Sequence, residues 1–282
     1  MSEEIYNWVN QSPYGQALGM TLTALCDDAA TIYLPFNEAN ANPGSALHGG
    51  VAASASVTAA HALTRHVLGP DTGPWHTMDF QINYLAAAIG EDISATAHLL
   101  RRGKEICFMA LDVRTDDGKA IAQCSIAVRG RQGKKLNETP LAAGDDGKVV
   151  PGFMGDRIGT NPFIGGRGIA MEFMRDGRVR LIMPWQDSNG DLDGGLHEGA
   201  ALALLDTAGA MCSWSITGLG KFKASTPSIQ AQILAPPPKS DLVAYGDVGF
   251  RDNEMFWNDI DVADAATGRL VARGTVLYRI FD

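Results

Sequence analysis

Two similar segments lie 149 residues apart in the chain, the distance from His48 to His197. The same shift superimposes further identical residues, namely Pro35 on Pro184, Asn40 on Asn189, Gly50 on Gly199, Thr58 on Thr207, Thr77 on Thr226, Gln81 on Gln230, Leu85 on Leu234, Asp92 on Asp241 and Asp112 on Asp261. One inserted residue near position 264 then moves Gly118 onto Gly268. Because these identities fall at equivalent points of one pattern of predicted elements, the chain is a tandem duplication.

The length and composition fit two soluble domains of ordinary size. The chain has 282 residues, of which 45% are hydrophobic and 20% are charged, so each half can bury a core of its own. The formal net charge of −9 argues against a general nucleic-acid-binding protein, which we would expect to be basic.

The sequence favours a cytoplasmic protein with no membrane partner. Residues 1–5 are acidic and lack the apolar core of a signal peptide. No apolar run approaches the length of about 20 residues that is needed to cross a bilayer. The four cysteines show no Cys-x-x-Cys spacing, so we expect them to be buried, reduced thiols.

The first repeat predicts a long helix set among short strands. An alanine-rich run without proline predicts a helix over residues 49–68, and the Gly69-Pro70 pair that follows is a stop signal. A loop rich in Asn, Gly and Pro precedes this helix at residues 37–47. Partial alternation and turn signals predict strands at residues 19–25, 30–36, 78–85, 93–100, 105–113 and 120–128.

The second repeat has the same order of predicted elements. A helix is expected at residues 198–217, with strands at residues 168–174, 179–185, 228–234, 242–250, 255–262 and 269–280. Residues 129–161 match neither repeat, and we divide the chain into an N-terminal domain (1–130), a linker (131–161) and a C-terminal domain (162–282).

This order predicts an α+β fold, in which each repeat wraps a curved antiparallel sheet around one central helix. Such an arrangement buries the helix nearly all round, which explains why both helices are apolar. Two such sheets placed edge to edge would also cover the edges that a lone sheet must protect.

The residues Asn42, His48, Gly49 and Gly50 resemble the signature of hotdog-fold thioesterases like the phenylacetate-pathway enzyme. The strand Asp79–Leu85 and the turn Gly90-Glu91-Asp92 match the pattern of that family too, and the resemblance covers residues 14–130 and 162–282. It implies two hotdog units that pair, and cleavage of acyl-CoA at their interface. One unit would supply the Asn and the His-Gly. The other would supply a helix acid nine residues after its own His, and a hydroxyl.

Each repeat carries only half of this set. The first has Asn42, His48 and Gly49, but Val57 stands where the acid is required. The second has Asp206 and Thr226, but Asp191 and Glu198 replace the Asn and the Gly on either side of His197. The resemblance therefore implies one composite catalytic site, Asn42, His48, Gly49, Asp206 and Thr226, and one inactive site.

Each residue of the composite site has a chemical role in thioester hydrolysis. The Gly49 N–H in the first helical turn would stabilise the oxyanion, and Asn42 would bind the thioester or hold the loop. His48 would fix the loop or the thioester, and Thr226 would hold the water or the carboxylate. Asp206 would be a general base or a nucleophile, and the residues alone leave both open.

Other interpretations of the sequence stay open. Asp206 could serve a structural role in its apolar helix, and both sites could have decayed to leave a non-catalytic acyl-CoA-binding module. Because one whole composite set is retained, we favour catalysis. An enoyl-CoA hydratase would require a different Asp/His arrangement.

The resemblance also bears on ligands and assembly. It implies acyl-CoA as substrate, no cofactor apart from the coenzyme A of the substrate, and a homo-oligomer of two chains. His61 and His66 are not spaced as a metal pair on one helix face, and we expect no metal. Met211 and Trp214 are candidates to line the acyl pocket, and basic loop residues, including Lys221 and Lys223, are candidates to meet the phosphates of coenzyme A.

Overall fold

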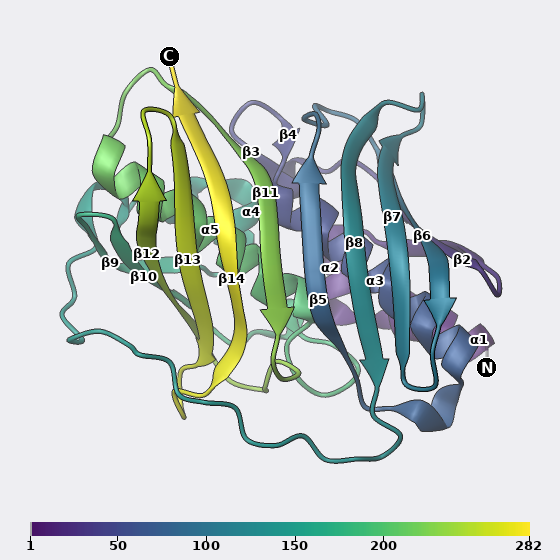
Figure 1. Ribbon diagram of the computed structural model, residues 1–282. Coiled ribbons are helices and arrows are strands. Elements are labelled where there is room, and N and C mark those ends of the chain that lie inside the picture. Colours follow the sequence, from purple (N-terminus) through teal and green to yellow (C-terminus); the bar gives the residue numbers. More distant parts are fainter. Residues whose placement is uncertain (1) are drawn as a thin grey trace.

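The computed structural model describes residues 2–282 and has two equivalent halves built around one large antiparallel sheet (Figure 1). The first half contains the strands β1 (Thr21–Leu25), β2 (Ala29–Leu34), β5 (Trp75–Tyr84), β6 (Ile93–Arg102), β7 (Ile106–Thr115) and β8 (Ala120–Gly130), and the helix α3 (Gly49–Leu68). The second half contains β9 (Ala170–Arg175), β10 (Arg178–Met183), β11 (Lys223–Ile233), β12 (Leu242–Arg251), β13 (Met255–Asp264) and β14 (Leu270–Phe281), and the helix α5 (Glu198–Thr217).

The repeat inferred from the sequence is confirmed by the elements. Both predicted long helices are present with the predicted bounds, and α5 follows α3 at the shift of the sequence repeat. All the predicted strands are present, although β5 begins at Trp75 and not at residue 78, and β11 begins at Lys223 and not at residue 228. The chain therefore has the predicted α+β architecture.

Strands β5 and β11 join the two halves into one sheet. The strand order is β1-β2-β6-β7-β8-β5-β11-β14-β13-β12-β10-β9, so each half contributes six consecutive strands. In the β5–β11 register Gln81 pairs with Gln230, its own equivalent under the repeat, so a pseudo-twofold axis passes between them. This confirms the expected edge-to-edge placement, since the inner edge of each half is covered by the other.

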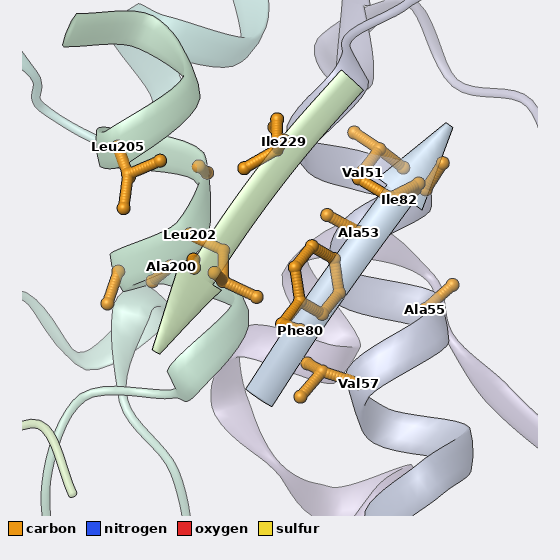
Figure 2. Packing of buried hydrophobic residues seen from close by; sticks show 14 of the residues in the cluster. Val51, Ala53, Ala55, Val57, Phe80, Ile82, Ala200, Leu202, Leu205 and Ile229 are labelled. Carbon is orange, nitrogen blue, oxygen red and sulfur yellow. The ribbon is translucent and has the colours of Figure 1, made fainter. Parts of the chain in front are cut away.

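Helices α3 and α5 lie against the same face of the sheet and pack against each other. Figure 2 shows Phe80 of β5 and Ile229 of β11 beside the small and branched residues of the two helices. A Cβ on Gly50 would lie 2.9 Å from Ala203 Cα, and one on Gly199 would lie 2.9 Å from Ser54 Cα. The glycines thus allow the close helix contact at both symmetric points.

The prediction that no apolar run approaches the length of a membrane span needs a correction at helix α5. This helix has 20 residues and sufficient hydropathy to cross a bilayer, yet 78% of its apolar window is buried inside the protein. It is therefore the core helix of its half. The prediction for the cysteines also needs a correction, because Cys107, Cys124 and Cys212 are buried but Cys26 is exposed.

Three helices outside the predicted pattern cover the ends of the core. They are α1 (Ser2–Gln11), α2 (Pro13–Leu18) and α4 (Pro162–Gly166). Helices α2 and α4 are equivalent under the repeat, and each begins at a proline after a capping residue, Ser12 or Asn161, which favours a helix start. Helix α1 has no α-helical counterpart among the described residues of the second half, where two 3₁₀ turns occupy the equivalent residues 151–160.

The short helices are exchanged between the halves. Helix α2 packs on the 3₁₀ turn η5 (Asp187–Asn189) of the second half, where the Tyr14 N–H donates to the Gly190 carbonyl at 3.0 Å. Helix α4 packs on η1 (Glu38–Asn40) of the first half. Each core helix therefore begins beside residues of the opposite half.

The remaining elements are short. They are the strands β3 (Ala41–Asn42) and β4 (Ala46–Leu47) and the 3₁₀ turns η2 (Pro70–Thr72), η3 (Gly152–Met154) and η4 (Ile158–Thr160). The segment from β8 to η3 crosses the second half as an irregular strap (Figure 1), attached by bridges from Leu141 to Arg269 and from Val150 to Phe173.

Candidate active site

Each core helix begins at a histidine that caps its own first turn. His48 Nδ1 accepts from the Gly50 N–H at 3.0 Å, and His197 Nδ1 accepts from the Gly199 N–H at 2.9 Å. In this arrangement the proton of each neutral ring is on Nε2. Burial lowers the pKa of His48, so its ring is neutral at physiological pH. Phe163, from the opposite half, stacks on His48 with the ring centroids 4.5 Å apart.

Asp206 reaches the start of α3 from the middle of α5. Its side chain is buried, with 3% of the residue exposed, and its Oδ1 accepts from the Thr226 hydroxyl at 2.9 Å. Its Oδ2 lies 3.6 Å from His48 Nδ1. Burial raises the pKa of Asp206, although His48, the Thr226 hydroxyl and the Gly50 amide act in the opposite direction. The carboxylate is thus held as a stronger base than an exposed aspartate.

Gly49 lies directly against this carboxylate. A Cβ at Gly49 would stand 2.8 Å from Asp206 Oδ2, so no other residue fits without displacing the acid. The Gly49 carbonyl accepts from the Tyr84 hydroxyl at 2.8 Å. Its N–H belongs to the first turn and finds no acceptor among the residues that the structure describes. A free donor at a helix N-terminus therefore stands beside a buried base.

Asn42 lies on β3, and its partner in the opposite half is Asn161 and not Asp206. Its Oδ1 accepts from Asn161 Nδ2 at 2.8 Å, and within residues 2–282 no hydrogen bond joins it to Asp206. The structure therefore brings four of the five predicted site residues into one cluster, namely His48, Gly49, Asp206 and Thr226. Asn42 precedes this cluster in the loop that leads to His48.

At the second site, Glu198 stands at the position that Gly49 has at the first site. The Thr77 N–H donates to both Glu198 carboxylate oxygens at 3.2 Å, and His61 Nε2 lies 3.0 Å from Oε2. Burial alone would raise the pKa of Glu198, but His61 and Thr77 lower it to about 2. Val57 stands where the first site has Asp206, and it is fully buried. The Glu198 carboxylate is therefore held by hydrogen bonds within the fold.

Helix α1 closes the second site. Trp8 stacks on His61 and His197 with centroid distances of 6.1 and 6.4 Å. The Arg65 guanidinium lies between two rings, 3.8 Å from the centroid of Trp8 and 4.4 Å from that of Trp75. A cavity of about 70 Å³ remains between these residues and Glu198.

A larger cavity lies elsewhere. It measures about 690 Å³ and lies against the face of the second half of the sheet that the strap crosses, and none of the five predicted site residues lines it. Its lining includes five carboxylates, Asp145, Asp146, Asp247, Asp259 and Asp261. Within residues 2–282, no three His, Cys, Asp or Glu side chains are grouped so that they could hold a metal ion.

Three residues at the cluster were not identified by the sequence analysis. Tyr84 was noted only as part of a strand, Asn161 was placed at the end of the linker, and Phe163 was assigned no role. The Asn-Pro pair at 161–162 is a helix-start signal that could have revealed α4. For Tyr84 a signal existed in the repeat, since its equivalent at the second site is the apolar Ile233.

Sequence comparisons relate the chain to proteins of known activity. The family of acyl-CoA thioesterase N-terminal domains matches residues 37–129. Human acyl-coenzyme A thioesterase 13 is 32% identical over 107 residues, which cover 37% of this chain and 74% of that protein. The medium/long-chain acyl-CoA thioesterase YigI of Salmonella typhimurium is 31% identical over 134 residues, covering 42% of this chain and 85% of that protein.

Solved structures resemble the chain over nearly its whole length. A protein of unknown function with the hot dog fold from Alicyclobacillus acidocaldarius has a TM-score of 0.69 at 15% identity, covering 95% of this chain and 98% of its own. Acyl-CoA thioesterase II TesB2 from Mycobacterium marinum has a TM-score of 0.65 at 9% identity, covering 95% of this chain and 96% of its own. At these identities the likeness shows the fold, and it confirms the predicted hotdog architecture.

Proposed function

The chain belongs to the acyl-CoA thioesterases with the hotdog fold, and we propose that it hydrolyses acyl-CoA at one composite site formed by both repeats. The observation that carries the proposal is the contact of Asp206, from the second repeat, with Gly49 and His48 of the first. A buried base beside a free helix N-terminal donor is the arrangement that thioester hydrolysis requires.

In the proposed reaction a water molecule between Asp206 and the thioester attacks the carbonyl carbon. Asp206 takes the proton of the water as the carbon–oxygen bond forms, and Thr226 keeps the carboxylate in place by its hydrogen bond to Oδ1. The negative charge moves to the carbonyl oxygen, which accepts from the Gly49 N–H and the Asn42 amide. The tetrahedral intermediate then breaks its carbon–sulfur bond, and Asp206 returns the proton to the departing coenzyme A thiolate.

We favour Asp206 as a general base over Asp206 as a nucleophile. Its raised pKa increases its proton affinity, which suits a base, but makes it a poorer leaving group in the breakdown of an acyl anhydride. Single-turnover hydrolysis in ¹⁸O-labelled water tests this. A base places label in the acid product and none in Asp206, so label in the Asp206 carboxylate would show an anhydride that water opens at the aspartyl carbonyl.

The second quasi-equivalent site is proposed to be inactive. The acid in the first turn of its helix is Glu198, which is held by Thr77 and His61 and has a pKa of about 2. A carboxylate of such low proton affinity is a weak general base. Trp8 and Arg65 also occupy the space beside it.

Two lysines are proposed to meet the phosphates of coenzyme A. Lys223 begins β11 and stands three residues before Thr226, a separation of about 10 Å along a strand. Lys221 and Lys223 are exposed, and in the described part of the chain neither has a carboxylate partner. Under the repeat, Thr72 and Pro74 are the equivalents of Lys221 and Lys223 at the second site. The two lysines therefore occur only beside the site that contains Asp206.

The test is thiol release from short, medium, long and aromatic acyl-CoA esters by wild type, Asp206→Asn and Val57→Asp. We expect Asp206→Asn to lose at least about 100-fold in kcat, since it removes the base, and Val57→Asp to add no activity. Full activity of Asp206→Asn would contradict the composite site. An inactive wild type that the same esters stabilise against heat would favour the alternative of a binding module. The cytoplasmic location and the pairing of two chains stay predictions of the sequence.

A further inference from the structure

Asn161 has a hydrogen-bonding pattern that fixes the orientation of its side-chain amide. It is the N-cap of α4, and its Oδ1 accepts from the backbone N–H of Phe163 at 3.1 Å and of Ile164 at 3.3 Å. Only the oxygen of an asparagine amide can accept, so the side chain cannot be reversed without losing both bonds. The Nδ2 group must therefore point away from the helix, and it donates to Asn42 Oδ1 at 2.8 Å.

The Asn161 Nδ2 donor determines which end of the Asn42 side-chain amide is free to bind a ligand. Because Asn42 Oδ1 is occupied by Asn161, the free end of Asn42 is its NH₂ group. Within residues 2–282 that NH₂ group has no acceptor. If the amide turned by 180°, a carbonyl oxygen would take its place and would repel a developing oxyanion.

The second site offers an internal comparison. The repeat places Ser12 where the first site has Asn161, and Asp191 where it has Asn42. Ser12 also caps its helix, since its Oγ accepts from the Gly15 N–H at 3.5 Å. Asp191 has no amide to orient. The capping function is thus common to both sites, whereas the amide donor occurs only beside Asn42.

We propose that Asn161 is a positioning residue for the composite site, which holds the Asn42 NH₂ group toward the reacting carbonyl. The inference rests on the proposed function, because it assigns the Asn42 amide to the transition state. It adds a residue from the opposite half that acts only through Asn42. The first site thereby depends on a third segment of the second half, besides Asp206 on α5 and Thr226 on β11.

Two substitutions keep the cap and remove the donor. Asn161→Asp and Asn161→Ser both retain an oxygen acceptor for α4, and all three residues are favourable N-caps. Neither variant can hold Asn42 Oδ1 as the amide does, and Asn161→Asp would draw the Asn42 NH₂ group toward itself. We expect kcat to fall by about 10-fold, with KM within about 3-fold of the wild-type value. This loss in kcat is smaller than the roughly 10²–10³-fold loss that follows removal of an oxyanion donor.

A double-mutant cycle with Asn42→Ala separates positioning from a general structural role. If Asn161 acts through Asn42, Asn161→Ser will cost nothing further once Asn42 is alanine. Independent losses that multiply in the double variant would overturn the proposal, and so would wild-type kcat in both Asn161 variants.

Ser12→Ala is the matched control, because it removes the equivalent cap at the site without a base. It should lower the melting temperature and leave kcat and KM unchanged. The composite site itself is tested by Asp206→Asn. Activity that survives in Asn42→Ala but collapses in Asp206→Asn would overturn the inference about Asn161 and leave the proposed base in place. Survival in both variants would overturn the composite site as well.

Discussion

Gly49 and Asp206 approach so closely that a Cβ on Gly49 would stand 2.8 Å from Asp206 Oδ2. At the equivalent point of the second half, Glu198 and Val57 line one small cavity. The Glu198 carboxylate accepts from Thr77, the counterpart of the Thr226 that holds Asp206. Each site therefore contains one carboxylate beside the repeated threonine, but the two are supplied by different helices. Only the arrangement with glycine leaves a free helix N-terminus next to the acid.

Gly49→Ala should inactivate the enzyme. The added methyl group would displace the Asp206 carboxylate and occupy the space beside the Gly49 N–H, so we expect kcat to fall by about 100-fold. The check is steady-state hydrolysis of the best ester. Gly159→Ala is the control, because a Cβ there would meet open space and should change neither activity nor stability. Near-normal turnover of Gly49→Ala would contradict the contact.

Asp206→Asn should make the protein more stable. Burial raises the pKa of Asp206 above its ordinary value of 3.8. The protonated side chain therefore stabilises the fold fully below pH 3.8, and this stabilisation is lost as the pH rises through the raised pKa. At neutral pH the ionised group destabilises the fold, and a neutral amide removes this cost. We expect a gain of about 1 kcal/mol, or roughly 2 °C in melting temperature. A lower melting temperature would show that the ionised carboxylate stabilises the fold.

Thr226→Val should move the acid limb of the pH–rate profile upward. The ionised form of Asp206 is the proposed base, so kcat/KM should fall as the pH drops through its pKa. The Thr226 hydroxyl lowers that pKa, and its removal should therefore shift the midpoint to higher pH. Thr77→Val, the change at the second site, should leave the midpoint where it is. An unchanged midpoint in Thr226→Val would show that the acid limb does not report the titration of Asp206.

Glu198→Gln should weaken the fold and leave turnover intact. The pKa of Glu198 is lowered to about 2, so its contribution to stability is present above its ordinary pKa of 4.5 and is lost as the pH falls toward about 2. We expect the variant to lose about 1–3 kcal/mol at neutral pH. Denaturant unfolding at several pH values would show this difference shrinking in acid. A loss of activity at neutral pH would instead give the second site a part in the reaction.

Lys221→Ala with Lys223→Ala should raise KM and leave kcat unchanged. The two exposed ammonium groups are proposed to bind the phosphates of coenzyme A equally in the ground and transition states, which affects KM alone. The increase should shrink at high ionic strength, where the contribution of these charges is screened. Lys135→Ala, also an exposed lysine, serves as the control. An identical KM in the double variant would place the phosphates elsewhere.

The sequence predicted the parts of the site that the repeat exposes. The resemblance to hotdog thioesterases implied the composite set once it was applied to both repeats, at positions 57 and 206 and at positions 49 and 198. The hydrogen bond of Asn161 to Asn42 joins residues 119 positions apart, and no local pattern encodes such a contact. Glu198 was interpreted as a loss at the second site. The structure shows that it is a buried, fully bonded carboxylate.

The pairing of β5 with β11 binds two non-identical halves into one sheet. In a dimer of identical chains every substitution appears twice, so a residue that improves one site must be tolerated in both. Covalent linkage removes that restriction. One interface can then keep a buried carboxylate at Asp206 while the equivalent position of the other holds the apolar Val57, an asymmetry that a pair of identical chains cannot evolve.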